Sequence, residues 1–443
     1  MKDVIITLKT KGTHLLMCFF FLLSCLYPCQ GAAAEEISIE SLTETEAAAE
    51  EENEDEVVLT VGDGSLPEPY ELHAYSALLY DAEAGRVLYE KNGYEVLPMA
   101  STTKIMTLLV ILENSEPDEI VTVSKNAAMQ PDVQLNMNTG EQYYVKDLCY
   151  SLMLESHNDT AVALAEHVGG SVEGFAAMMN AKAKALGAYS ANFVTPNGLD
   201  ADGHGTNAAD LAKIAAYAVK QEEFIEITNT ASYSFTELTK GRGFTVSNKN
   251  RFLTMMDGAI GVKTGFTGKA GYCFVGAVKR DDRLLVSVVL ACGWPPNKNY
   301  KWSDTGKLME YGIKGFEKKP LLTEKSRLPE LPELPVIEGQ KESVALCYGE
   351  EELAELLETR LLLSGEEQIS FVPELTKSSL PAPVEQGTEV GRLLVKVGKD
   401  CIKTIPVRTA EAVVPVDYKF YFSRALRDFF SGAAVKRLLF PQE

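Results

Sequence analysis

The most informative stretch of this chain is Ser-Thr-Thr-Lys at residues 101–104, which is followed by the apolar run Ile-Met-Thr-Leu-Leu-Val-Ile-Leu at 105–112. The serine lies three residues before the lysine, and residues at this spacing share one face of a helix, so the hydroxyl and the amine can touch. A buried lysine near another cation loses proton affinity and can then accept the proton of a serine. The stretch therefore predicts Ser101 as a nucleophile and Lys104 as its base. A serine that only caps a helix is the alternative.

Two further short motifs follow along the chain, Ser156-His-Asn158 and Lys263-Thr-Gly265. Ser-x-x-Lys, Ser-x-Asn and Lys-Thr-Gly, in this order, are typical of penicillin-binding proteins and serine β-lactamases. With its flanking segments the chain resembles the D-alanyl-D-alanine carboxypeptidases, which are low-molecular-mass penicillin-binding proteins of the S11 serine peptidase type. The flanks that carry this resemblance are 98–107, 196–200 and 261–272, and the resemblance is strong over 67–318.

The resemblance implies an α+β fold of the serine β-lactamase/transpeptidase type, with an antiparallel sheet and a helical lobe. The residue patterns themselves agree with such a fold, because apolar periods of 3.6 and 2 alternate along 67–318. Lys263 is expected on or just before the first of the two strands that follow it. The expected elements are a β-hairpin over 74–90, helices at 145–154, 161–168, 175–186 and 208–219, and strands at 271–278 and 284–291.

The resemblance also assigns roles to the motif residues. Ser156 would relay a proton to the leaving amine, and Asn158 would bond both Lys104 and the substrate amide. Lys263 would keep the pocket positive and attract the terminal carboxylate of the substrate, to which Thr264 would donate a hydrogen bond. The oxyanion hole would consist of the backbone N–H groups of Ser101 and of Phe266, which follows Gly265.

The implied reaction is removal of the terminal D-alanine from peptidoglycan stem peptides through an acyl-enzyme on Ser101, with β-lactams as covalent inhibitors. Three alternatives remain open. A D,D-endopeptidase uses the same residues, and a non-catalytic β-lactam sensor would keep the fold. A class A β-lactamase uses an extra glutamate for deacylation, but the corresponding segment 195–206 contains aspartates and no glutamate.

Two histidines suggest other chemistries that the sequence disfavours. His157 invites a Ser-His-Asp triad, but no Gly-x-Ser-x-Gly elbow is present, and we expect this residue in the cleft wall. Asp200, Asp202 and His204 invite a metal site, but the stretch is short and contains no His-Glu-x-x-His, so a surface turn is expected. We therefore predict no metal and no cofactor.

The N-terminal 66 residues predict export rather than a folded domain. Residues 1–34 combine a basic start, an apolar core at 15–27 and small residues at 32–34, which is typical of a secretory signal; a retained anchor and lipoprotein processing at Cys25 are the alternatives. Residues 35–66 form an acidic spacer that we expect to be disordered. Its segment 35–56 holds ten glutamates and one aspartate, and so supplies 11 of the 21 excess negative charges. The acidic balance argues against nucleic-acid binding.

The C-terminal third predicts a second domain and a membrane contact. A proline-rich linker is expected at 319–340, and a small, mostly β, sandwich-like domain at 341–415, with helical composition over 350–363. Residues 416–443 combine an apolar face with basic residues, which is typical of an amphipathic helix on an anionic membrane; packing on its own domain is the alternative. We therefore expect a secreted protein that is attached peripherally to the outer face of the cytoplasmic membrane.

The five cysteines beyond the signal, at 149, 273, 292, 347 and 401, are an odd number with scattered spacing, so no disulfide framework is predicted. Small core residues are the expectation, and a bridge between Cys273 and Cys292 on neighbouring strands is the alternative.

Overall fold

The computed structural model describes residues 57–60, 69, 71–323, 326–365 and 367–430. The predicted signal at 1–34 and most of the predicted spacer lie outside these residues. Within the part that is described, no helix is both long enough and apolar enough to pass through a membrane.

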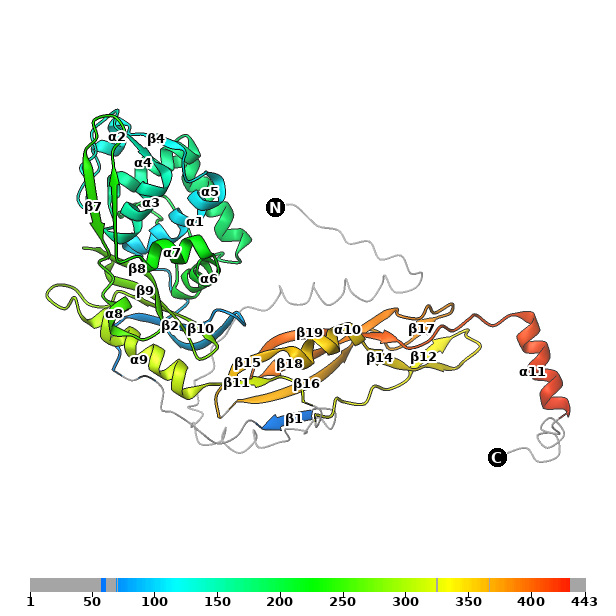
Figure 1. Cartoon of the computed structure of the whole chain (residues 1–443). Coiled ribbons are helices and arrows are strands. Elements are labelled where there is room, and N and C mark those ends of the chain that lie inside the picture. Colours follow the sequence, from blue (N-terminus) through cyan, green and yellow to red (C-terminus); the bar gives the residue numbers. More distant parts are fainter. Residues whose placement is uncertain (1–56, 61–68, 70, 324–325, 366, 431–443) are drawn as a thin grey trace, which may run out of the picture. The chain divides into compact units, whose positions relative to one another are not determined.

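A five-stranded antiparallel sheet, in the order β3-β2-β10-β9-β8, organises the first domain (Figure 1). The predicted hairpin is confirmed as two paired strands. Lys263 lies on a strand of its own at the sheet edge, so the prediction that placed it on or just before the first of the following strands needs correction. The strands are β2 (Ser76–Asp81), β3 (Arg86–Lys91), β8 (Ala259–Thr267), β9 (Gly271–Arg280) and β10 (Arg283–Leu290).

Helices bury both faces of this sheet, because the strands carry apolar residues on both sides. One core lies under α9 (Tyr300–Gly315), the last helix of the first domain, and contains Phe274, Leu285 and Trp302. The other core lies between the sheet and the helical lobe and contains the apolar residues of α1 (Lys104–Asn114). Figure 1 shows these helices on opposite sides of the sheet.

The helical lobe confirms the four helices predicted from the apolar period. They are α3 (Val145–Leu154), α4 (Asn158–Gly169), α5 (Val172–Ala185) and α6 (Ala208–Ala218). Asn207 caps α6, as its side chain accepts a hydrogen bond from the N–H of Asp210. The smaller elements of this domain are β4 (Ile120–Thr122), α2 (Lys125–Ala128), β5 (Gln142–Tyr144), α7 (Glu222–Asn229), β6 (Ser232–Thr236), β7 (Gly243–Ser247) and α8 (Phe252–Met255).

The second domain is mostly β, as predicted. A five-stranded sheet has the order β1-β16-β18-β19-β14, and a smaller one has the order β13-β12-β17. The helical composition over 350–363 divides into helix α10 (Glu350–Glu358) and strand β15 (Arg360–Leu363), which pairs with β11 (Glu317–Pro320). The other strands are β12 (Leu334–Ile337), β13 (Ser343–Val344), β14 (Leu346–Tyr348), β16 (Gln368–Leu375), β17 (Leu380–Pro381), β18 (Glu389–Val397) and β19 (Asp400–Thr409).

Two segments predicted to lie outside this domain contribute strands to it. Part of the expected linker 319–340 is strand β12, in which Leu334 and Val336 are buried while Pro335 between them is exposed. Alternating burial of this kind is typical of a strand with one face in the core. The prolines of the segment had indicated a linker instead. Likewise, Val57–Thr60 of the expected spacer is strand β1, which pairs antiparallel with β16. β-Branched valines favour that conformation.

Helix α11 (Tyr418–Phe430) occupies the described part of the predicted amphipathic segment. None of its residues is buried. The remainder of the prediction, 431–443, lies outside the described residues.

All five described cysteines are free thiols. Cys149, Cys273 and Cys292 are buried, as expected, but Cys347 and Cys401 are exposed, so the core prediction is wrong for those two. A Cys273–Cys292 bridge is absent because the two thiols lie in the cores on opposite faces of the sheet.

Candidate active site

Ser101 lies in a single 3₁₀ turn, η2 (Ala100–Thr103), that leads directly into α1. The cap residue of α1 is Thr103, and its side chain makes no capping bond. The hydroxyl of Ser101 instead donates to the main-chain carbonyl of Asn197 at 3.3 Å. The contacts therefore do not support Ser101 as a helix cap.

Lys104 occupies the first position of α1 and has no exposed surface. Its Nζ lies 3.0 Å from Oγ of Ser101, which confirms that the predicted spacing brings the two groups together. Two further oxygens surround the same nitrogen, Oδ1 of Asn158 at 2.9 Å and the carbonyl oxygen of Asn197 at 2.7 Å. The amine is thus held by groups from three separate parts of the chain.

Burial, and secondly the positive charge of Lys263, lower the pKa of Lys104 well below the ordinary value for lysine, while Asp159 acts in the opposite direction. Both lysine side chains are almost completely inaccessible to solvent. Removing a cation from water costs free energy, so the neutral amine is favoured at this position. A neutral amine next to a serine hydroxyl is a base in contact with its proton donor.

Ser156 and Asn158 lie where α3 ends and α4 begins. Asn158 holds Lys104 with its oxygen, while its Nδ2 donates to the carbonyl oxygens of Pro131 at 3.1 Å and Asp132 at 3.0 Å. Both N–H donors of this amide are therefore directed at protein carbonyls, and the bond between Asn158 and a substrate amide stays a prediction. Oγ of Ser156 is buried and has no hydrogen-bond partner among the described residues.

Strand β8 carries Lys263, Thr264 and Gly265 past the 3₁₀ turn. A Cβ atom placed on Gly265 would lie 3.0 Å from the backbone nitrogen of Ser101, so only glycine lets the strand approach the turn this closely. Phe266, the next residue, is 43% exposed and its ring packs at 4.6 Å against that of Tyr272. The close approach to the backbone of Ser101 is thus at Gly265, one residue before Phe266.

Lys263 is 2% exposed, and burial lowers the pKa of its ammonium to about 7. Its Nζ donates to the carbonyl oxygen of Thr264 at 3.1 Å. An anion that binds beside this group would raise its pKa again, because the charge of the anion favours the ammonium. The site is therefore suited to a carboxylate.

The carbonyl of Asn197 is a member of the site that residue-type reasoning missed. Asn197 and Gly198 belong to the flank 196–200, to which the sequence assigned no role. Gly198 has φ +82°, and a Cβ on it would overlap the carbonyl oxygen of Ala100. A main-chain acceptor leaves no residue signature, so the required glycine was the only signal that could have revealed it.

Gly198→Ala is therefore expected to lower the free energy of unfolding more than Gly140→Ala does. Gly140 has a similar φ of +86° but no atom within 4 Å of an added Cβ. Backbone strain alone costs about 1–3 kcal/mol, and only Gly198→Ala adds steric overlap. Denaturant unfolding of both variants measures the difference, and equal losses would contradict a close approach at Gly198.

The two histidines have structural environments. His157 is only 4% exposed, and its Nδ1 lies 2.8 Å from the hydroxyl of Ser151 rather than near Ser101. The Nδ1 of His204 accepts from the N–H of Val194 at 3.0 Å, so its Nε2–H donates to the hydroxyl of Thr103 at 2.9 Å. His204 is therefore a neutral interior group, and burial lowers its pKa to about 4. Among the described residues, no group of three or more His, Cys, Asp or Glu could hold a metal ion.

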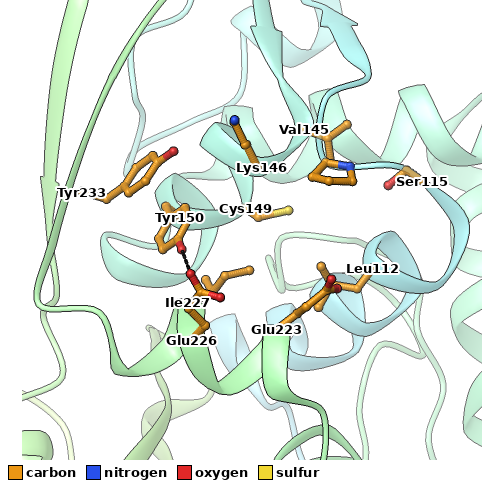
Figure 2. Close-up of a pocket in the computed structure, with 11 residues that line it drawn as sticks. Leu112, Ser115, Val145, Lys146, Cys149, Tyr150, Glu223, Glu226, Ile227 and Tyr233 are labelled. Carbon is orange, nitrogen blue, oxygen red and sulfur yellow. Dashed lines mark hydrogen bonds between the residues drawn. The ribbon is translucent and has the colours of Figure 1, made fainter.

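A cavity of about 320 Å³ opens elsewhere, between α1, α3, α7 and β6 (Figure 2). None of the motif residues lines it. Its wall contains Cys149, whose thiol pKa is raised by burial, and Tyr150, which donates to Glu226. A protonated thiol is not a nucleophile, so this cavity does not compete with the Ser101 site for the chemistry.

Known protein families match both domains of this chain. Residues 64–293 match the family described as D-alanyl-D-alanine carboxypeptidase, and residues 316–415 match the penicillin-binding protein 5, C-terminal domain. The D-alanyl-D-alanine carboxypeptidase DacF of Bacillus subtilis is 31% identical over 373 residues, which are 83% of this chain and 92% of that protein.

Two solved structures also superpose on this chain. Penicillin-binding protein 5 from Haemophilus influenzae superposes with a TM-score of 0.59 at 25% identity, over 79% of this chain and all of that one. The Streptomyces K15 DD-transpeptidase superposes with a TM-score of 0.53 at 32% identity, over 56% of this chain and 99% of that one. With its buried Ser101–Lys104 pair and these matches over both domains, the chain belongs to the family of serine-type D-alanyl-D-alanine carboxypeptidases.

Proposed function

We propose that this protein removes the terminal D-alanine from peptidoglycan stem peptides. The observation that carries the proposal is the 3.0 Å contact between Ser101 Oγ and a completely buried Lys104 whose pKa is depressed. This pair supplies a nucleophile and its base at neutral pH. The family assignment supports the choice of substrate.

In the proposed reaction, Lys104 takes the hydroxyl proton as Ser101 Oγ bonds to the carbonyl carbon between the two D-alanines. The C–N bond then breaks, and the leaving amine receives a proton through Ser156, whose buried hydroxyl has no hydrogen-bond partner among the described residues. Water afterwards attacks the ester, and a proton returns to Ser101. D-Alanine and a peptide shortened by one residue are the products.

Lys263, Thr264 and the two backbone amides act on the substrate in this proposal. Lys263 pairs with the terminal carboxylate, which restores the ammonium charge that burial disfavours. Thr264 donates to the same carboxylate. The N–H groups of Ser101 and Phe266 stabilise the oxyanion, and the close passage of β8 at Gly265 supports their pairing.

Wild-type protein incubated with a diacyl-L-Lys-D-Ala-D-Ala tripeptide tests the proposal. We expect release of free D-alanine and a long-lived penicilloyl adduct seen by intact mass. Rapid turnover of nitrocefin would instead indicate a β-lactamase, and cleavage of cross-linked muropeptides without D-alanine release from the tripeptide would indicate an endopeptidase. An adduct without any peptide cleavage would indicate a sensor.

We further propose that the chain is exported through its N-terminal signal and that α11 attaches it to an anionic membrane surface. Tyr418, Phe422 and Phe429 are exposed by 80%, 54% and 66%, and they share one face of the helix at i, i+4 and i+11. Arg424 and Arg427 lie on the opposite face. Apolar side chains and cations segregated in this way favour the interface of an anionic bilayer.

Truncation after Pro415 is expected to abolish sedimentation with vesicles that contain anionic phosphatidylglycerol, while D-alanine release from soluble tripeptide persists. In the full chain, Phe422→Ser with Phe429→Ser should weaken vesicle binding by about tenfold or more, because two aromatic side chains that would enter the bilayer interface are lost. Arg360→Ser, on strand β15, is the control. Unchanged sedimentation of the truncated protein would refute membrane attachment through α11.

A further inference from the structure

The catalytic lysine has more hydrogen-bond acceptors around it than the proposed chemistry has used. Ser101, Asn158 and Asn197 all contact Nζ of Lys104, and the shortest contact, at 2.7 Å, is to the carbonyl oxygen of Asn197. Oγ of Ser101 lies 3.3 Å from the same carbonyl oxygen. The flank 196–200 therefore reaches into the centre of the site through its main chain.

The chemistry of these three neighbours determines how a neutral lysine must be oriented. Oδ1 of Asn158 and the carbonyl oxygen of Asn197 can only accept hydrogen bonds. A neutral amine has two N–H groups and one lone pair, so both N–H groups are directed to these two oxygens. The lone pair is left facing Oγ of Ser101 at 3.0 Å, which is the direction from which a proton must arrive.

A single loop holds both orienting oxygens in place. Gln130, at the start of this loop, accepts a hydrogen bond through Oε1 from Nδ2 of Asn197 at 3.0 Å. The next residues, Pro131 and Asp132, supply the carbonyl oxygens that take both N–H groups of Asn158. The Asn197 side chain is 3% exposed, and its other end accepts from the N–H of Leu199 at 3.0 Å. Displacement of the loop would move both acceptors together.

We propose that Gln130 is a positioning residue for this reaction: through its hydrogen bond to Asn197, it sets the carbonyl that aims the Lys104 lone pair at Ser101. The inference rests on the proposed function, since it concerns the same base. In the part of the chain that the structure describes, Gln130 is hydrogen-bonded to Asn197 but to neither Ser101 nor Lys104, so it acts through Asn197. The loop start is thus part of the catalytic apparatus although it carries none of the three motifs.

The charged groups facing Lys104 determine the sign of the expected pH effect. Lys263 on β8 disfavours the ammonium of Lys104 and Asp159 on α4 favours it, while the pKa of His157 is itself lowered by burial. The Asn197 carbonyl also favours the ammonium, because it accepts a hydrogen bond from it. Loss of that carbonyl therefore lowers the pKa of Lys104. It also removes one of the two acceptors that direct the lone pair of Lys104 toward Oγ of Ser101.

The test is the pH dependence of wild-type and variant acylation by a fluorescent penicillin, between about pH 5 and 10. For Gln130→Met, which keeps the length of the side chain but removes the acceptor, we expect a plateau rate about tenfold lower, with the acidic limb moved to lower pH. Gln130→Glu keeps an acceptor oxygen and adds a negative charge, so its plateau should recover and its acidic limb should move to higher pH.

Gln134→Met is the matched control. Gln134 belongs to the same loop and donates to the backbone carbonyl of Gln130, whereas the side chain of Asn197 is bonded to Gln130 and to the N–H of Leu199. Its pH profile should coincide with that of the wild type. Three results would each overturn the proposal. The acidic limb of Gln130→Met could stay where it is in the wild type, or the plateau rate of Gln134→Met could fall as much as that of Gln130→Met. The third is an acidic limb of Gln130→Glu that does not move to higher pH. A wild-type protein that is not acylated at all would refute the proposed function instead.

Discussion

Ser101→Ala is expected to abolish both D-alanine release and penicillin adduct formation, with a loss of at least about a thousandfold. Oγ of Ser101 is the atom that would carry the acyl group, and its closest neighbour is the buried amine of Lys104 at 3.0 Å. Among the described residues, Nζ of Lys104 is hydrogen-bonded to no other serine hydroxyl.

The fold should survive this change, because removal of one hydroxyl leaves the apolar residues of α1 in place. Intact-mass analysis with penicillin, together with a thermal melt, separates loss of chemistry from loss of structure. Ser115→Ala is the matched control, since this serine follows α1 and donates to the carbonyl oxygen of Ile111, away from the three motifs. A penicilloyl adduct that persists on Ser101→Ala would show that another residue is the nucleophile.

Lys104→Met should lower the acylation rate by about a hundred- to ten-thousand-fold, which is the range of a lost general base. Methionine is close to the lysine stem in size, so the buried site stays filled. Thermal stability should change little, because the substitution also removes the cost of placing an amine where burial and Lys263 both disfavour its charged form.

The pH dependence provides the sharper evidence on Lys104. In the wild type, acylation should fall as the pH drops through the depressed pKa of Lys104, since the ammonium cannot accept the proton of Ser101. That limb should be absent from Lys104→Met, whose residual rate no longer depends on this group. Lys146→Met, on the exposed surface of α3, is the control. A limb that persists unchanged in Lys104→Met would assign it to a different residue.

Local patterns predicted most of the catalytic domain. The helices at 145–154 and 208–219 emerged from their apolar period, and the hairpin and the strand pair emerged from alternation. The hydrophobic patterns were misread where another feature of the same segment, such as its proline content, indicated a different structure. The prolines around Leu334 and Val336 indicated a linker, yet these two residues are buried in strand β12. The prediction that Cys347 and Cys401 are core residues was also wrong, because residue type alone does not specify on which face of a strand a side chain lies. Both cysteines are exposed.

The order of the three motifs, the Ser101–Lys104 spacing and the family can all be recognised from the amino-acid sequence alone. Spacing of three residues is a local property, and a helical start is enough to bring that pair together. Only the tertiary structure decided how the lysine is aimed. The side chains of Asn158 and Gln130 and the carbonyl of Asn197 come from three separate segments that meet only on folding. Every residue carries the same carbonyl, so its role depends on where the folded backbone places it rather than on residue type.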